Sequence, residues 1–180
     1  MNEIKIFLTV IILIICFSCR KNIFKDDELS IKKNNYTGNQ LKIDGYYYTR
    51  YGSPEKLTIY LFFNNGILLH TGDSYEYNKL NEFEQIITSV DFINKLKGIK
   101  YSWGAYKIEG NNIQFERWYP STPPLKAYVR AGTILNDTTF LITESYRMQD
   151  RKKTEVDSEN ETYHFKKYTP KPDSTNNFIN

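Results

Sequence analysis

Residues 103–119, WGAYKIEGNNIQFERWY, have the pattern of a β-hairpin. The central residues Glu109-Gly110-Asn111-Asn112 include types that tolerate the left-handed backbone of a tight turn. On both sides of this turn apolar residues alternate with polar ones, which predicts two strands that share one apolar face. The residues of that face are Tyr106, Ile108, Ile113, Phe115 and Tyr119. Such a face needs a core to pack against.

Similar alternating segments lie on both sides of the hairpin. They predict further strands at residues 41–51, 57–63, 67–70, 125–135, 139–146 and 163–168. A long charged loop is expected over residues 147–161. The chain contains 15 tyrosines, which suit half-buried strands because the ring packs while the hydroxyl reaches water.

One segment has helical periodicity. Between Asn81 and Lys97 the apolar residues recur every three or four positions, which predicts an amphipathic helix. Asn81 and Glu84 have the spacing of a capping box, and Gly98 follows as a stop signal. Ser89 and Asp91 could divide this helix into two shorter ones.

These elements predict a mainly β protein of about eight strands in consecutive hairpins, with one helix inserted between strands 3 and 4. The expected fold is an antiparallel up-and-down β-barrel, because closure removes exposed strand edges. At 180 residues the chain fits one domain, and we expect a monomer. Its net charge of +3 is too balanced to predict a nucleic-acid partner.

The N-terminal region has the features of a signal peptide. Residues 6–15 are apolar apart from Thr9, follow Lys5, and give way to polar sequence directly after Cys19. The run is shorter than the roughly 20 apolar residues of a membrane-spanning helix, so residues 1–18 are predicted to be a cleaved signal. A retained anchor helix is the alternative.

Ser18 before Cys19 resembles the lipobox of bacterial lipoproteins, in particular small lipoproteins of Bacteroidota. The resemblance implies cleavage before Cys19, lipid on its thiol, and acyl chains that hold the protein in the membrane. It also implies the bacterial cell envelope and the outer membrane, with the periplasmic and surface faces both open. A disulfide between Cys16 and Cys19 is the alternative use of these two cysteines.

The regions on either side of the predicted barrel are polar and lack periodicity. Residues 19–40 are predicted to be a flexible tether and residues 169–180 a disordered tail, which leaves residues 41–168 as the folded domain. Within the tether, Lys25-Asp26-Asp27-Glu28 resembles an export signal of some Bacteroidota lipoproteins. A solvated run of charges is the alternative.

Residues 41–168 resemble the lipocalin-like, or calycin, domains of small Bacteroidota lipoproteins. The resemblance is carried by the strand meander, by Gly45 followed by aromatic residues, and by Trp103-Gly104-x-Tyr106. It implies a barrel whose interior is either filled by side chains or holds one small ligand.

One charged residue falls on the inward face of the hairpin. Arg117 follows Ile113 and Phe115 at the same two-residue spacing, so it is expected on their face, where it could bind the carboxylate or phosphate of a ligand. The other expected contacts of this small hydrophobic or anionic ligand are Tyr47, Phe115, Tyr119 and Glu144. Because Glu144 follows Ile142 at the inward period, the alternatives are an internal pair of Arg117 with Glu144 and an Arg117 side chain that extends to the rim.

Two tryptophans fall on the opposite face of the hairpin. Trp103 and Trp118 would lie beside Tyr128 and Arg130 if the next strand pairs with the hairpin. Such a surface aromatic patch could bind a sugar or an envelope protein partner. Alternatively, Trp103 packs beneath the helix.

The sequence holds no recognised catalytic, nucleotide-binding or metal-binding motif, and we expect no cofactor. A metal at His70 would need carboxylates such as Asp73 or Glu76, and none is predicted. The leading hypothesis is non-catalytic binding of a small or extended ligand. The alternatives are an interaction module, such as an inhibitor, immunity protein or accessory subunit, and a hydrolase of envelope glycans acting through Glu116 or Glu144.

Overall fold

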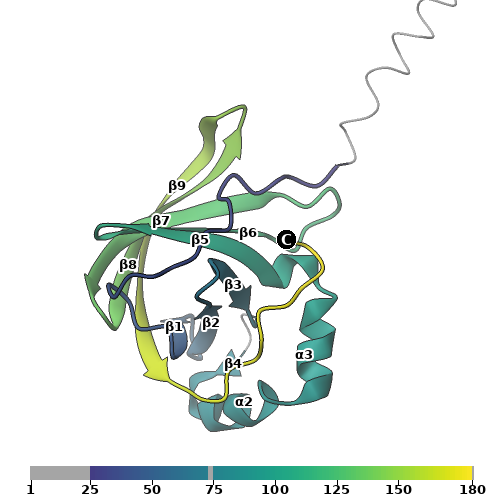
Figure 1. Ribbon diagram of the computed structural model, residues 1–180, viewed down its shortest axis with the longest axis vertical. Helices are drawn as coiled ribbons and strands as arrows, with labels where there is room; N and C mark the ends of the chain where they lie inside the picture. The colour runs from purple at the N-terminus through teal and green to yellow at the C-terminus, as the bar shows by residue number, and fades with distance from the viewer. Residues whose placement is uncertain (1–24, 73–74, 180) are drawn as a thin grey trace, which may run out of the picture.

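The structure is a computed structural model that describes residues 25–72 and 75–179, and it confirms the predicted antiparallel up-and-down β-barrel (Figure 1). Within these residues eight strands close the barrel: β1 (Gly45–Tyr51), β2 (Lys56–Phe62), β3 (Ile67–His70), β5 (Trp103–Glu109), β6 (Asn112–Trp118), β7 (Ala127–Asn136), β8 (Thr139–Gln149) and β9 (Lys152–Lys167). Each pairs with the next, and β9 returns to β1. The short β4 (Tyr75–Glu76) pairs with β2.

The central hairpin forms as predicted. Strands β5 and β6 pair in a register that places Tyr106 opposite Phe115 and Ile108 opposite Ile113. Gly110 takes the left-handed conformation in the turn, with φ of 60°. Tyr106, Ile113 and Phe115 are buried inside the barrel, so the alternation identified the correct face.

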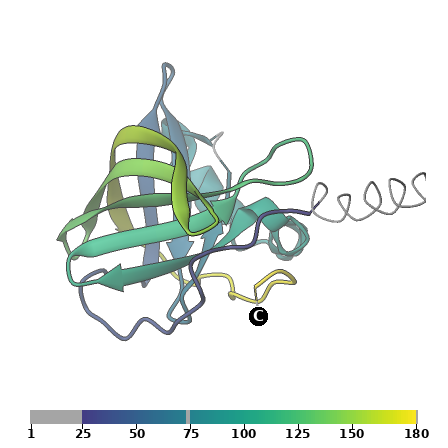
Figure 2. The same ribbon diagram turned by 90° about the horizontal axis from the view of Figure 1, so that it is seen from above.

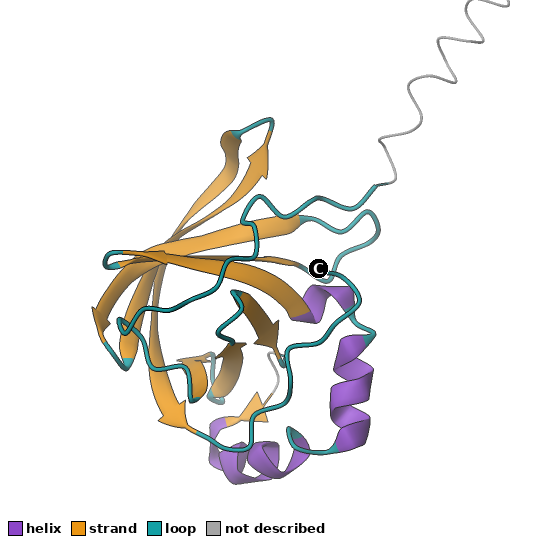
Figure 3. Cartoon of the chain, in the orientation of Figure 1, coloured by secondary structure: helices purple, strands orange, loops and turns teal. Residues whose placement is uncertain are grey.

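Two helices replace the single helix predicted over residues 81–97. Between β3 and β5 the described residues form α2 (Leu80–Ile86) and α3 (Val90–Lys97), with 3-10 turns at Tyr77–Lys79 and Lys100–Ser102 (Figure 3). The Ser89 hydroxyl accepts a hydrogen bond from the Phe92 amide, which starts the second helix. The predicted capping box is wrong, because α2 begins after Lys79 and has no side-chain cap.

Side chains fill most of the barrel interior. Its buried core consists of Leu41, Tyr47, Tyr60, Phe62, Leu68, Tyr106, Ile113, Phe115, Ile134, Phe140, Ile142 and Tyr163. The rings pack in tilted, edge-on and stacked pairs, as between Phe62 and Tyr106, whose centroids are 4.9 Å apart. Among the described residues, the space for a ligand inside the barrel therefore lies toward one of its ends.

A second core lies between the barrel wall and the two helices. Ile59 and Leu61 on the outer face of β2 pack there with Phe83 of α2, Leu96 of α3 and Trp103. This explains why both faces of β2 are apolar. Trp103 is fully buried, and its indole Nε1 donates a hydrogen bond to the Leu96 carbonyl at 2.9 Å.

The predicted flexible tether is wrong for residues 25–40. Residues 25–32, here called the N-terminal strap, lie along the outer face of the barrel, and Leu29 and Ile31 are buried there. They pack with Ala105, Trp118, Ala127, Val129, Ala131 and Tyr146. Residues 1–24 are outside the described part of the chain, and with them the predicted signal peptide and Cys19.

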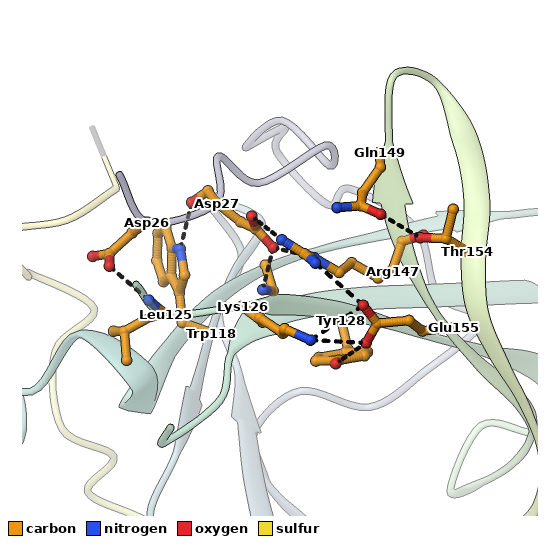
Figure 4. A network of polar contacts seen from close by, with 11 residues as sticks. Asp26, Asp27, Trp118, Leu125, Lys126, Tyr128, Arg147, Gln149, Thr154 and Glu155 are labelled. Atoms are coloured by element: carbon orange, nitrogen blue, oxygen red, sulfur yellow. Dashed lines mark hydrogen bonds and ion pairs between the residues drawn. The ribbon is translucent and has the colours of Figure 1, made fainter. Parts of the chain in front are cut away.

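Asp26 and Asp27 fasten the strap to the barrel (Figure 4). The Asp27 carboxylate accepts hydrogen bonds from Nε and Nη2 of Arg147, both at 2.7 Å, and from the Ala127 amide at 2.9 Å. Asp26 accepts from the Leu125 amide and pairs with Lys100 at 2.8 Å. These two aspartates are therefore not part of a solvated charge run.

The predicted disordered tail also packs on the barrel. The Lys171 ammonium donates to the carbonyls of Ile43 and Phe62, both at 2.6 Å, and Phe178 and Ile179 pack against the second core. The folded unit thus extends beyond residues 41–168 to include the strap and the described part of the tail, as far as Ile179.

The predicted charged loop over residues 147–161 is wrong, because β8 and β9 continue as a hairpin that projects beyond the barrel in Figure 1 and points toward the viewer in Figure 2. Its turn uses Asp150 and Arg151, with φ of 49° and 64°, the positive values that a two-residue hairpin turn favours. No helix among the described residues is long and apolar enough to cross a membrane.

Candidate functional site

A pocket of about 280 Å³ opens at the end of the barrel where β6 finishes and β7 begins. We call it the mouth pocket. Its lining comes from five strands and the residue after β6: Thr49, Arg50, Tyr51, Thr58, Tyr60, Arg117, Tyr119, Arg130, Glu161 and Tyr163. The aromatic core closes the barrel beneath it, since Tyr60 and Tyr163 belong to both the lining and the core.

Arg117 projects inward, as the alternation of β6 predicts. Its side chain is buried, and its Nε donates to the Tyr60 hydroxyl at 3.1 Å. Its Nη1 donates to the carbonyls of Tyr101 and Trp118, at 3.3 and 3.1 Å. The guanidinium carbon lies 3.9 Å from the ring centroid of Tyr119. These contacts fix Arg117 in the pocket wall.

Glu144 lies on the other face of the barrel, contrary to the prediction. A register shift between Ile142 and Glu144 breaks the alternation of β8. Glu144 then pairs across the strands with Ala131, a residue of the outer cluster under the strap, and its carboxylate contacts Lys153. The alternative internal pair with Arg117 would need Glu144 on the inner face.

Arg130 lies in the mouth pocket instead of a surface patch. It stands opposite Phe115 in the β6–β7 register, so it shares the inner face. Its Nη2 is 2.6 Å from Glu161 Oε2 and 3.6 Å from Glu159 Oε1, an ion-pair contact. Yet Nε and Nη2 are both shielded from water and make no well-aligned hydrogen bond with the described residues. Buried donors of this kind are rare in folded proteins.

The predicted surface aromatic patch does not form. Trp103 is covered by the helices and Trp118 by the strap, where its Nε1 donates to the Asp27 carbonyl at 2.7 Å. Tyr128 stays at the rim of the barrel, with its ring 5.3 Å from that of Tyr119 and its hydroxyl donating to Glu155. Tertiary packing therefore removes both tryptophans from the surface.

Of the other predicted ligand contacts, one lines the mouth pocket and two belong to the aromatic core. Tyr119 lines the pocket, and Phe115 packs beneath it with its ring 5.0 Å from that of Tyr60. Tyr47 is wholly within the core, and its hydroxyl donates to the Asp137 carbonyl away from the pocket. Sequence reasoning missed Tyr60, Tyr163 and Glu161, although the inward period of their strands could have indicated the two tyrosines.

The buried tyrosines of the pocket stay protonated. Burial is the main cause that raises the pKa of Tyr60 and of Tyr163 above the usual value, so both hydroxyls are neutral at physiological pH. Tyr163 donates to Glu161 Oε2 at 2.8 Å. The charges that line the pocket therefore belong to Arg117, Arg130, Glu161 and Arg50, and Arg50 faces the Tyr77 ring at 3.6 Å.

Glu116, the second carboxylate of the hydrolase hypothesis, lies beneath the strap. It accepts hydrogen bonds from the Ser30 hydroxyl at 2.9 Å and the Ile31 amide at 2.8 Å. Burial raises its pKa, and these hydrogen bonds offset part of the increase. Neither Glu116 nor Glu144 lines the mouth pocket.

Within residues 25–72 and 75–179, no three His, Cys, Asp or Glu side chains gather closely enough to hold a metal ion. Comparison of the chain with models of protein families, with curated proteins and with solved structures found no match. The fold and the site together define a small antiparallel β-barrel with a charged, tyrosine-rich pocket at one end.

Proposed function

We propose that this protein is a lipid-anchored lipoprotein of the bacterial envelope whose barrel binds a small acidic ligand in the mouth pocket without catalysis. The observation that carries the proposal is the charge of the pocket wall, where the largely buried Arg117 and Arg130 lie together and Glu161 is the one carboxylate among the lining residues. Removing a guanidinium from water is unfavourable unless its donors find partners. An anion in the pocket would balance the positive charge that Glu161 leaves uncompensated.

The size of the pocket supports a small ligand over an extended one. Its volume of about 280 Å³ is at the lower limit of ligand pockets, which hold roughly 300–1,000 Å³. The aromatic core beneath it leaves no channel for a long chain among the described residues.

The chemistry of the lining supports an acid. A guanidinium presents parallel N–H groups that match the two oxygens of a carboxylate or phosphate. Tyr60, Tyr119 and Tyr163 add apolar ring surface and hydroxyls around Arg117 and Arg130. Pockets for small molecules commonly combine aromatic walls with a few polar groups.

The anchor part of the proposal depends on Cys19 and the lipobox that it resembles. Two or more acyl chains would hold the protein firmly, where one would allow release. Replacement of Cys19 with Ser should abolish lipid labelling and release the protein from membranes. Continued labelling of Cys19→Ser would contradict the anchor.

Titrations followed by NMR chemical shifts test the pocket, with cyclohexanecarboxylate and inorganic phosphate as probes. Arg130→Gln should weaken the binding of the acid about tenfold or more, because hydrogen bonds to a charged partner contribute about 1.5–3 kcal/mol. Arg151→Gln, in the exposed hairpin turn, is the matched control and should bind as the wild type does. Equal binding by Arg130→Gln and the wild type, or no binding of either probe by the wild type, would refute the proposed site.

A further inference from the structure

We infer that the ligand of the mouth pocket is a polyhydroxylated small acid, of the class of sugar acids. This inference rests on the proposed function, in which the ligand is a small acid, and adds that the ligand also carries several hydroxyl groups. The wall that holds Arg130 also holds Glu161, so the pocket offers a cationic donor and an anionic acceptor side by side. A simple acid uses only the first of these.

Glu161 retains accepting capacity toward the pocket. Its side chain is 34% exposed, and it borders the pocket together with Tyr163. In the part of the chain that the structure describes, its contacts with the Tyr163 hydroxyl and with Arg130 Nη2 both use Oε2. An ionised carboxylate has about four acceptor positions and no donor, so Oε1 suits a ligand that donates.

Hydroxyl groups fit this acceptor better than an ammonium group does. Arg117 and Arg130 both line the pocket, and they would repel a cationic ligand. Arg130 also compensates part of the Glu161 charge at 2.6 Å. A neutral hydroxyl can donate to Glu161 without facing either repulsion.

The rest of the lining agrees with a hydroxylated ring. Thr49 and Thr58 stand opposite each other in the β1–β2 register, so both hydroxyl-bearing side chains share the pocket face. The tyrosine rings offer apolar surface to the C–H groups of a ring. A volume of 280 Å³ corresponds to about nine water molecules at about 30 Å³ each, which is close to the size of one substituted ring.

Three probes separate the contribution of the acid group from that of the hydroxyl groups. D-glucuronate carries both the acid and the hydroxyls, cyclohexanecarboxylate carries only the acid, and D-glucose carries only the hydroxyls. In NMR titrations of the full folded domain, glucuronate should bind about tenfold more tightly than cyclohexanecarboxylate, and glucose more weakly than glucuronate. Glu161→Gln should remove most of the glucuronate advantage while cyclohexanecarboxylate binds as well as before or better.

Glu159→Gln is the matched control. It also removes a negative charge near Arg130, at 3.6 Å, but Glu159 does not line the pocket. This change should strengthen both acids alike and keep their ratio. Thermal unfolding of each variant shows whether it is folded.

The outcomes distinguish this inference from the proposed function. If both acids bind and depend on Arg130, but glucuronate has no advantage or keeps its advantage in Glu161→Gln, the inference is overturned and the acid site stands. If the wild type binds neither acid, both are overturned.

Discussion

Asp27→Asn should detach the first part of the N-terminal strap from the barrel. In the folded protein the Asp27 carboxylate accepts two hydrogen bonds from Arg147 and one from the Ala127 amide (Figure 4). An amide has one acceptor oxygen and no charge, so it cannot replace the bidentate contact.

The magnitude follows from the burial of the pair. Breaking a fully buried ion pair removes about 3–5 kcal/mol, whereas exposed pairs contribute at most about 1 kcal/mol. The side chains of Arg147 and Asp27 are 15% and 21% exposed, and Arg147 keeps a second partner in Glu155 at 3.2 Å. We therefore expect a loss of about 2 kcal/mol, which for a chain of this size is about 4–8 °C in Tm.

The loss should depend on pH. Burial alone would raise the pKa of Asp27, but the hydrogen bonds from Arg147 and Ala127 outweigh it and lower the pKa below its usual value. Because the folded pKa is the lower one, the stabilisation is present above the unfolded pKa and disappears as pH falls through the folded pKa. Wild type and Asp27→Asn should therefore begin to converge in stability as pH falls below the ordinary Asp pKa of about 3.9, and the difference should vanish only below the lower, folded pKa.

Urea unfolding at pH 7 and at low pH measures this difference, and amide hydrogen exchange at Ala127 reports the local contact. Glu28→Gln is the control, because Glu28 is exposed and pairs with Lys25 at the surface. It should leave stability unchanged. A wild-type stability for Asp27→Asn at pH 7, or a loss that persists unchanged at low pH, would refute the reasoning.

Two further predictions concern the tail and two glycines of the β5–β6 hairpin. Burial lowers the pKa of Lys171 to about 8, below its unfolded value, so the folded protein binds fewer protons than the unfolded chain at alkaline pH. The free energy of unfolding of the wild type should therefore rise by about 1 kcal/mol between pH 8.5 and 9.5, relative to that of Lys171→Met. Urea unfolding at the two pH values measures this difference. A difference that does not change with pH would argue against that shift. An added Cβ at Gly104 would lie 2.2 Å from the Glu116 carbonyl oxygen, whereas one at Gly110 meets no atom within 4 Å. Circular dichroism melts should therefore show Gly104→Ala as strongly destabilised, and Gly110→Ala as losing only about 1–2 kcal/mol from its positive φ; equal losses would contradict this.

The barrel and Arg117 could be predicted from the sequence because both depend on local alternation. The period-two pattern in β5 and β6 is unbroken, so it places Arg117 on the same face as Ile113 and Phe115. In β8 the same reasoning fails at Glu144, because the register shift between Ile142 and Glu144 moves Glu144 to the other face. Such a shift leaves no signal in residue type.

The covering of Trp118 by the strap and the packing of the chain's described ends could not be predicted, because their partners are distant in sequence, whereas Trp103 packs beneath the helices that precede it closely in the chain. Asp27 and Arg147 are 120 residues apart, and only Leu29 and Ile31 in the strap are apolar and buried. The extension of β8 and β9 as a hairpin was not predicted for a different reason. It projects beyond the core, so its residues need no apolar alternation, and its turn uses Asp150 and Arg151 instead of Asn-Gly.

If Cys19 carries the lipid anchor that we propose, the fastening of the strap would limit the distance between the barrel and the membrane. Only six peptide steps separate Cys19 from Lys25, and a fully extended chain of that length spans about 20 Å. With the lipid anchor that we propose, the loop around Leu125, to which Asp26 and Asp27 bind, would stay beside the lipid headgroups. The mouth pocket opens at this same end, so ligand exchange would take place at the bilayer surface, and the protein could not carry its ligand from one membrane to another.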